Sequence, residues 1–267
     1  MAKYIYLLLL FVALTLGGCS KYSKILKSSN YELKYTYACQ YYENQSYSKA
    51  LPLLEELLTI FKGTEKGEKI YYYYCKTNYE LGDYILAGYH CKVFARNYPN
   101  NEHAEECAYL HAYCFYLDSP KYSLDQTNTQ AAIEEMQVFI NEHPNSTRVA
   151  QANEIIDKLR YKIATKQYEA ARHYYFVENY KAAIVAFENV IKDNPSTPYR
   201  EKTMVAIIKS YYLLAEQSID VKKAERYQLS IDNYYKFVDA FPASEQLKEC
   251  ESIYNKCVKQ KQKSQQI

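Results

Sequence analysis

The chain has 267 residues, with 33 basic and 31 acidic side chains and a formal net charge of +2 at pH 7. A charge so close to zero provides no strong field to attract nucleic acid. Its six glycines argue against a turn-rich β fold and against an enzyme that cradles phosphate in a glycine-rich loop. The composition therefore favours a helical protein that is large enough to bury a core.

The N-terminal residues have the pattern of an export signal. Lys3 precedes an apolar run from Tyr4 to Leu16, and two glycines separate that run from Cys19. This pattern resembles the signal of bacterial lipoproteins. It predicts a signal peptide over residues 1–18, lipid attachment at Cys19 and a lipidated tether over residues 19–29.

An uncleaved membrane anchor is the alternative for this segment. A membrane-spanning helix needs about 20 apolar residues, and the run here is shorter, with polar residues directly after it. Acyl chains on Cys19 would hold the protein at a membrane without spanning it. By resemblance to lipoproteins of double-membraned bacteria, Ser20 and Lys21 after the cysteine indicate the outer membrane, and we expect its periplasmic face.

Tyrosine and cysteine usage are both unusual. Thirty-three tyrosines and no tryptophan suggest many half-buried rings, because a tyrosine can pack its ring while its hydroxyl stays hydrated. Most of these rings are expected to fill core positions, and a minority to line a binding face. Cys107 and Cys114, like Cys250 and Cys257, are spaced by about 10 Å along a helix, too far for a disulfide within it. We expect the cysteines to be small core residues rather than a disulfide framework.

Four amphipathic segments end in the same way. A small residue stands 12 positions before a proline in each, and proline ends a helix because it lacks the N–H and clashes with the preceding turn. The fixed offset therefore predicts one helix of constant length. An earlier copy, starting at Ala50, has Lys62 and Gly63 in place of proline, and glycine can close a helix at positive φ. The other pairs are Ala87 and Pro99, Ala132 and Pro144, Ala183 and Pro195, and Ser230 and Pro242.

A second small residue lies upstream of each of these helices, in a tyrosine-rich stretch. The two small residues are 12 positions apart in three copies and 20 apart in two copies. The longer copies share an insertion, over Leu117–Thr129 and Glu216–Gln228, which is predicted to form extended loops or extra helical turns. The upstream residues are Ala38, Cys75, Ala112, Ala171 and Ser210.

Paired helices with small residues at their crossing, an aromatic residue after the turn and a terminal proline resemble the tetratricopeptide repeat. One such hairpin cannot bury its apolar face alone. The sequence therefore predicts an all-α tetratricopeptide-repeat solenoid of about five helical hairpins plus a C-terminal capping helix, with unrelated hairpins as the alternative. The resemblance rests on Leu81-Gly82-Asp83-Tyr84 with Ala87, on Asn44-Gln45-Ser46-Tyr47 with Ala50, and on Glu178-Asn179-Tyr180 with Ala183.

One long segment divides the predicted array. Thr147–Val177 contains neither proline nor glycine and predicts a single extended helix. It separates an N-terminal group of three repeats, residues 30–145, from a C-terminal group of two repeats with a capping helix, residues 146–267. The capping helix is predicted over Glu245–Lys263, and its lysines suit the polar outer face that a repeat array needs.

No constellation in the sequence predicts catalysis. His103, Cys107 and His111 recur at helical spacing, but the first and last are about 12 Å apart along a helix, so one helix cannot bring all three to a zinc ion. Motifs such as HExxH, GxSxG or a phosphate-binding loop do not occur. We expect a protein that is not an enzyme and that uses no metal or cofactor.

Binding is the remaining function. In tetratricopeptide repeats the first helix of each pair lines a concave surface, and aromatic rims suit an extended or β-forming peptide. The repeat register predicts eight peptide-binding residues on that side. They are Tyr35, Tyr42, Tyr72, Lys76, Tyr79, Tyr109, Tyr113 and Tyr116.

The whole chain resembles the BamD family of outer-membrane-protein assembly lipoproteins over roughly Tyr31–Val258. The resemblance is carried by the lipoprotein signal, the repeats, Tyr98-Pro99-Asn100-Asn101 with Ala104–Tyr109, and Ala132–Pro144. It implies a non-catalytic role in the β-barrel assembly machinery. The N-terminal repeats would bind unfolded outer-membrane proteins by the C-terminal strand of those proteins. The C-terminal repeats would bind the barrel-forming core subunit.

Two other functions fit parts of the sequence. A general periplasmic scaffold for cell-envelope or cell-wall proteins would use the same repeats with different partners. A nutrient-binding lipoprotein of the starch-uptake kind would need a separate glycan platform, for which the chain has no room. Neither they nor the assembly role calls for nucleic acid as a partner.

Overall fold

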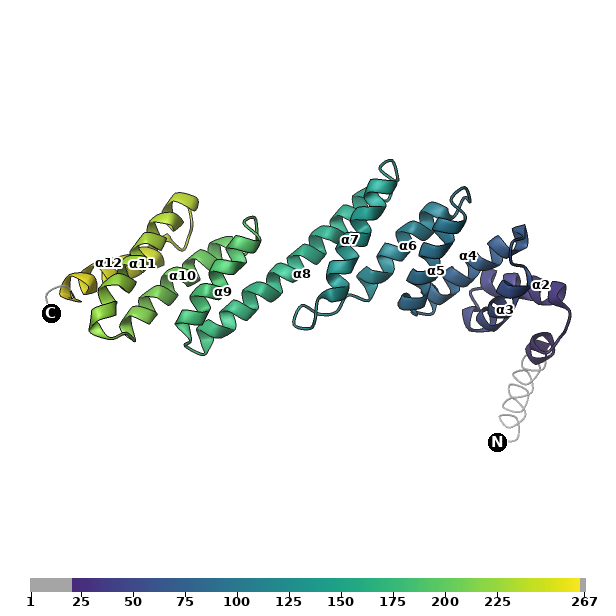
Figure 1. Cartoon of the computed structure of the whole chain (residues 1–267), viewed down its shortest axis with the longest axis horizontal. Helices are drawn as coiled ribbons and strands as arrows, with labels where there is room; N and C mark the ends of the chain where they lie inside the picture. The colour runs from purple at the N-terminus through teal and green to yellow at the C-terminus, as the bar shows by residue number, and fades with distance from the viewer. Residues whose placement is uncertain (1–20, 265–267) are drawn as a thin grey trace, which may run out of the picture. The chain divides into compact units, whose positions relative to one another are not determined.

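The computed structural model describes residues 21–264, and every regular element in that range is a helix (Figure 1). The predicted all-α class is confirmed. Consecutive helices pack as antiparallel hairpins, as expected for tetratricopeptide repeats. The helices are α2 (Tyr31–Glu43), α3 (Tyr47–Ile60), α4 (Glu65–Glu80), α5 (Tyr84–Asn97), α6 (Ala104–Leu117), α7 (Thr127–Glu142), α8 (Val149–Phe176), α9 (Tyr180–Asp193), α10 (Arg200–Glu216), α11 (Asp220–Ala240) and α12 (Leu247–Ser264).

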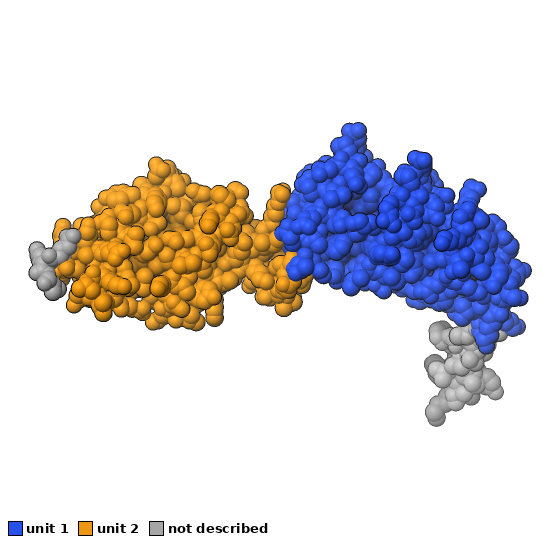
Figure 2. Space-filling model, viewed as in Figure 1, with its two compact units in different colours: residues 1–119, 127–156 blue, residues 120–126, 157–267 orange. Residues whose placement is uncertain are grey.

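The chain divides into two compact units (Figure 2). Of the described residues, unit 1 comprises 21–119 and Thr127–Ile156, and unit 2 comprises Pro120–Gln126 and 157–264. Unit 1 thus contains the hairpins α2–α3, α4–α5 and α6–α7. Unit 2 contains most of α8 with α9, the hairpin α10–α11, and α12.

The small residues of the repeat lie where helices cross. All ten are buried, with exposed fractions of 1% or less. Small side chains at these positions let helix axes approach closely, so that larger neighbours can fill the space on either side. The repeat register derived from sequence is therefore confirmed in both units.

The helices end where the prolines of the repeat and Gly63 predict. The helices α5, α7, α9 and α11 each end two residues before a proline of the repeat. After α3 the chain turns through Gly63, whose φ of 78° belongs to the left-handed region. The turns inside the shorter hairpins use the same region at Gln45, Gly82 and Glu178, each five residues before a buried alanine.

The shared insertion takes a different form in each of its two copies. Residues 118–126 form a loop between α6 and α7, whereas only residues 217–219 separate α10 from α11, so the second insertion adds helical turns to α11. The predicted long helix is α8, which has 28 residues. The predicted cap is α12.

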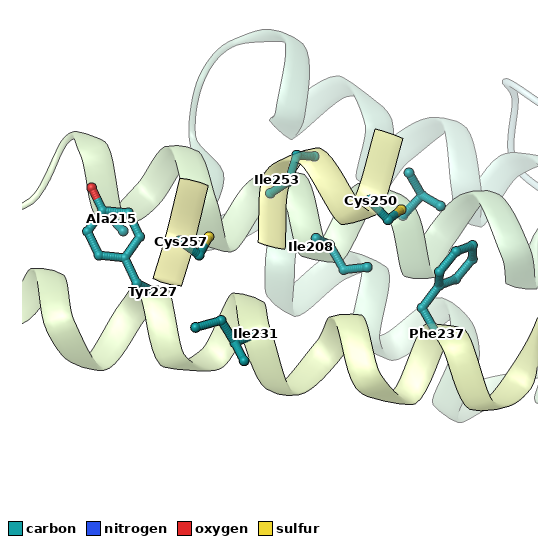
Figure 3. Close-up of a cluster of buried hydrophobic side chains, with 9 residues drawn as sticks. Ile208, Ala215, Tyr227, Ile231, Phe237, Cys250, Ile253 and Cys257 are labelled. Atoms are coloured by element: carbon teal, nitrogen blue, oxygen red, sulfur yellow. The ribbon is translucent and has the colours of Figure 1, made fainter. Parts of the chain in front are cut away.

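Each unit has its own apolar core. In unit 2, Tyr227, Ile231 and Phe237 of α11 face Cys250, Ile253 and Cys257 of α12 (Figure 3). In unit 1, Cys75, Cys91 and Cys107 meet around Phe94, one from each of α4, α5 and α6. All seven cysteines of the described range are buried and free, and they occupy core positions as expected.

Candidate functional site

The eight predicted binding residues all lie on α2, α4 and α6, the first helices of the three hairpins in unit 1. Their side chains are less exposed than expected for residues that line a binding surface. Tyr72 and Tyr109 are buried, with 8% and 5% of their surface exposed, and the other six are half-buried. The exposed part of this face therefore consists of ring edges and polar atoms rather than whole rings.

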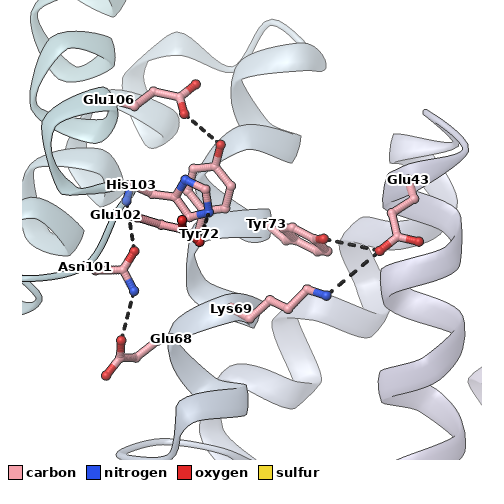
Figure 4. Close-up of polar contacts among 9 residues, drawn as sticks. All are labelled: Glu43, Glu68, Lys69, Tyr72, Tyr73, Asn101, Glu102, His103 and Glu106. Atoms are coloured by element: carbon pink, nitrogen blue, oxygen red, sulfur yellow. Dashed lines mark hydrogen bonds and ion pairs between the residues drawn. The ribbon is translucent and has the colours of Figure 1, made fainter.

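A carboxylate joins α4 to α6 at the centre of this face. The Tyr72 hydroxyl donates to Glu106 Oε2 at 2.8 Å (Figure 4). Lys76 Nζ donates to Glu106 Oε1 at 3.1 Å. The Tyr72 ring also stacks on the imidazole of His103, with centroids 3.7 Å apart. Two of the predicted residues, Tyr72 and Lys76, therefore hold neighbouring hairpins together.

The protonation states of this centre follow from its contacts. Burial raises the pKa of Glu106, but the hydrogen bonds from Tyr72 and Lys76 outweigh burial and bring that pKa below its ordinary value. Burial, followed by the hydrogen bond to Glu106, raises the pKa of Tyr72 far above its usual range. At neutral pH the site therefore holds an ionised carboxylate and a neutral phenol.

Further polar contacts connect the neighbouring elements. Asn101 Nδ2 donates to Glu68 Oε2 at 2.9 Å, which ties the segment before α6 to α4 (Figure 4). The Tyr73 hydroxyl donates to Glu43 Oε1 at 3.3 Å, and Lys69 Nζ lies 3.9 Å from the same oxygen, which ties α4 to α2. The three first helices thus form one continuous polar and aromatic surface.

A cavity of about 500 Å³ opens on this surface between α2, the start of α4 and the start of α6. Of the eight predicted residues only Tyr35 lines it. The sequence reasoning missed the others, although Lys66, Lys69 and Tyr73 lie three or four residues from one another on one face of α4, a spacing that could have revealed them. The cavity is lined by Tyr35, Glu65, Lys66, Glu68, Lys69, Tyr73, Asn101, Glu102 and His103.

A second aromatic cluster contains Tyr79, Tyr109, Tyr113 and Tyr116. The rings of Tyr109 and Tyr113 stack with centroids 5.5 Å apart, and Tyr113 lies 5.4 Å from Tyr116 and 6.4 Å from Tyr79. The Arg148 guanidinium sits 5.5 Å above the Tyr109 ring. The buried Tyr109 hydroxyl has no hydrogen-bond partner among residues 21–264. An unpaired buried hydroxyl costs about 1–3 kcal/mol, a cost that a bound molecule could relieve only if the Tyr109 ring turned its oxygen outward.

The remaining predicted binding residue, Tyr42, stacks on Tyr73 with centroids 3.7 Å apart. It links the cavity side of α4 to α2. The predicted lipid-attachment residue, Cys19, lies outside the described residues. Within residues 21–264, no helix is both long enough and apolar enough to cross a membrane.

His103, just before α6, and Cys107 and His111 on α6 each pack against neighbouring parts of the protein. His103 stacks on Tyr72, Cys107 belongs to the core, and His111 Nδ1 donates to the Gly88 carbonyl at 2.8 Å. Burial lowers the pKa of His111, and the Glu135 carboxylate, whose Oε2 lies 3.1 Å from Nε2, acts in the opposite direction. Across the described range, no three or more His, Cys, Asp or Glu side chains are grouped so as to hold a metal ion.

Fold and surface together define a class: a tetratricopeptide-like repeat protein of helical hairpins whose first helices in unit 1 are rich in aromatic residues. The sequence matches the YfiO family, described as an outer membrane lipoprotein, over residues 28–229. The chain therefore belongs to this family.

Two individual proteins show what the chain is similar to. The outer membrane protein assembly factor BamD of Rickettsia prowazekii (strain Madrid E) is 25% identical over 217 residues, covering 77% of this chain and 82% of that protein. Among solved structures, the TPR domain of P58(IPK) covers 90% of this chain and 69% of its own, with 14% identity and a TM-score of 0.39.

Proposed function

We propose that this protein is a non-catalytic lipoprotein at the periplasmic face of the outer membrane, where it takes part in the assembly of outer-membrane β-barrel proteins. The observation that carries the proposal is membership of the outer membrane lipoprotein family over most of the chain. The similarity to an outer membrane protein assembly factor supports the process. Cleavage removes the signal peptide, residues 1–18, and acyl chains on Cys19 then anchor the protein in the membrane.

The partner of the α2, α4 and α6 face is an unfolded barrel precursor. Stacked tyrosines offer apolar contact that tolerates many side chains, and polar atoms such as the Tyr109 hydroxyl can pair with a peptide backbone. The cavity beside Tyr35 and Lys69 is wide enough to receive a side chain of the bound segment. The hydrogen bonds from Tyr72 and Lys76 to Glu106 hold α4 against α6 while precursors bind and leave.

The first test removes one oxygen atom. In Tyr109→Phe the ring stays packed against Phe139, whose centroid is 5.3 Å away, and the unpaired hydroxyl is lost. We expect unchanged or slightly higher stability, because a buried unpaired group disappears, and several-fold weaker binding of a synthetic C-terminal barrel-strand peptide in a fluorescence titration.

The matched control is Tyr211→Phe in unit 2, which removes a hydroxyl that donates to Glu188 at 3.1 Å. It should leave the peptide affinity unchanged. Equal affinities for Tyr109→Phe and the unaltered protein would remove the Tyr109 hydroxyl from the binding site.

Unit 2 is the proposed dock for the barrel-forming core subunit. Tyr174, Ala182 and Val185 line a shallow depression of about 550 Å³ on α8 and α9. Val185 is 54% exposed and Tyr174 43%, and exposed apolar side chains gathered around a depression suit a protein contact. The division into an N-terminal precursor-binding group and a C-terminal docking group remains part of this proposal.

The second test places a charge in that depression. Val185→Glu should lower recovery of the core subunit from a solubilised envelope extract at least tenfold. In the complex the new carboxylate would be buried without a partner, which is costly. Val138→Glu is the control, because Val138 on α7 is 45% exposed and belongs to unit 1. Recovery of cell-wall proteins without a core subunit, by the unaltered protein, would instead favour a general periplasmic scaffold.

A further inference from the structure

The segment that follows Cys19 is packed against the first hairpin rather than free. Residues 21–26 are helical, and Ile25 is 4% exposed within the core formed by α2 and α3. The Tyr22 hydroxyl donates to the Lys49 carbonyl at 3.3 Å, and its ring meets Tyr41 edge-on at 5.7 Å. The helix over residues 21–26 is therefore part of the α2–α3 hairpin.

Because of this packing, the chain that links Cys19 to the folded hairpin is very short. Only Ser20 stands between Cys19 and Lys21. An extended chain spans at most about 3.6 Å per residue, so the Cα atom of Lys21 lies within about 7 Å of that of Cys19. That distance is shorter than the Debye length of about 8 Å at physiological salt. An acylated Cys19 would thus hold the α2–α3 hairpin directly at the lipid headgroups.

The surface held there is basic. With Tyr22 and Ile25 facing α2 and α3, a turn of 100° per residue places Lys24 and Lys27 on the opposite, exposed side. Lys21 is also exposed, and its Nζ lies 5.1 Å above the Tyr37 ring. From Cys19 to Tyr31 the chain contains these three lysines and no acidic residue.

We propose that Lys21, Lys24 and Lys27 form a docking surface for anionic phospholipid headgroups, which seats the α2–α3 hairpin on the membrane. The inference rests on the anchor at Cys19 that the proposed function includes. It adds a second attachment, because basic residues within a Debye length of an anionic leaflet are attracted to it. The short chain to Cys19 and the exposed charge of Lys24 and Lys27, on the side opposite α2 and α3, select lipid as the occupant.

Vesicle binding by the acyl-free chain tests the electrostatic attachment on its own. Residues 19–267 with Cys19→Ser are mixed with vesicles of phosphatidylcholine alone or with three parts in ten phosphatidylglycerol, and binding is measured by co-sedimentation. We expect binding that needs phosphatidylglycerol and is lost in high salt. The double variant Lys24→Gln/Lys27→Gln should weaken it on the order of tenfold or more.

Lys259→Gln/Lys263→Gln is the matched control, because it removes the same charge from exposed positions on α12. It should change binding less than twofold. Equal weakening by the two double variants, or equal binding to both kinds of vesicle, would overturn the inference.

The acyl anchor is checked separately in cells. Mass analysis of the N-terminal peptide should show acyl chains on Cys19, and Cys19→Ser should move the protein out of the membrane fraction at high salt. An unmodified Cys19 would contradict the anchor in the proposed function. Acylated protein whose acyl-free form ignores phosphatidylglycerol would contradict only the headgroup docking.

Discussion

Replacing Phe94 with alanine is expected to lower the unfolding free energy of unit 1 by about 3–5 kcal/mol. Phe94 is fully buried on α5 and lies at the centre of the core that α4, α5 and α6 share. Its ring contacts Tyr72 and Tyr98, with centroids 6.0 and 5.1 Å away. Truncation removes this apolar contact and leaves a cavity that closely packed helices cannot fully close. Urea unfolding followed by far-UV circular dichroism measures the loss.

The same substitution at an exposed position provides the control. Phe176 at the end of α8 is 66% exposed, so Phe176→Ala should change stability by less than about 0.5 kcal/mol. Phe94→Ala should also weaken peptide binding, because the Tyr72 ring that bridges to Glu106 loses its support. Similar stability changes at the two positions would contradict the assignment of Phe94 to the centre of the unit 1 core.

The helical architecture could be predicted because it depends on local chemistry. Proline disfavours continuation of a helix, although Pro52 is accommodated inside α3, and a fixed distance from Pro99 or Pro195 back to a small residue therefore indicates a helix length. The burial of Ala87 and Ala183 follows from that register. These constraints need no knowledge of which helices become neighbours, so sequence alone carries them.

The conformations of the two insertions could also have been predicted from their local sequence. The first contains Pro120, and proline with the residue before it disfavours helix, so residues 118–126 form a loop. The second has no proline, and Asp220 opens α11 with a carboxylate at the positive end of the helix dipole. Proline placement could therefore have distinguished the loop from the helical extension.

The candidate site was harder to predict because it depends on contacts between hairpins. Helical register put Tyr72 and Tyr109 on the correct helices, but it could not show that ring stacking and neighbouring helices would bury them. The cavity wall includes Asn101 and His103, which precede α6 and reach the site only because hairpins stack. The meeting of Cys75, Cys91 and Cys107 likewise requires three helices in space.

The N-terminal segment illustrates a further limit. The sequence suggested a lipidated tether over residues 19–29, between Cys19 and the first repeat. A helical turn that buries Ile25 and partly buries Tyr22 is too short to stand out as an amphipathic pattern. Its packing depends on an apolar surface of α2 and α3 that only the folded hairpin presents.

Gly67→Ala should destabilise unit 1, although glycine to alanine inside a helix ordinarily gains about 1 kcal/mol. Gly67 lies in the first turn of α4, and a Cβ atom there would stand 2.0 Å from the Phe61 carbonyl oxygen and 2.9 Å from its carbon. Both atoms belong to the backbone. The turn cannot easily move away, because Thr64 Oγ1 donates to that carbonyl at 2.7 Å and accepts from Gly67 N at 3.1 Å.

We expect a net loss of about 1–3 kcal/mol for Gly67→Ala, the usual cost of overpacking a tight site, measured as a lower urea midpoint. Thr59→Ala, at an exposed position of α3, should stay within about 0.5 kcal/mol of the unaltered protein. Because Glu65, Lys66 and Glu68 directly flank the turn and line the cavity, the peptide affinity should fall together with stability. A stabilised Gly67→Ala would mean that the α3–α4 turn is looser than these contacts require, and it would remove the reason to treat the cavity as preformed.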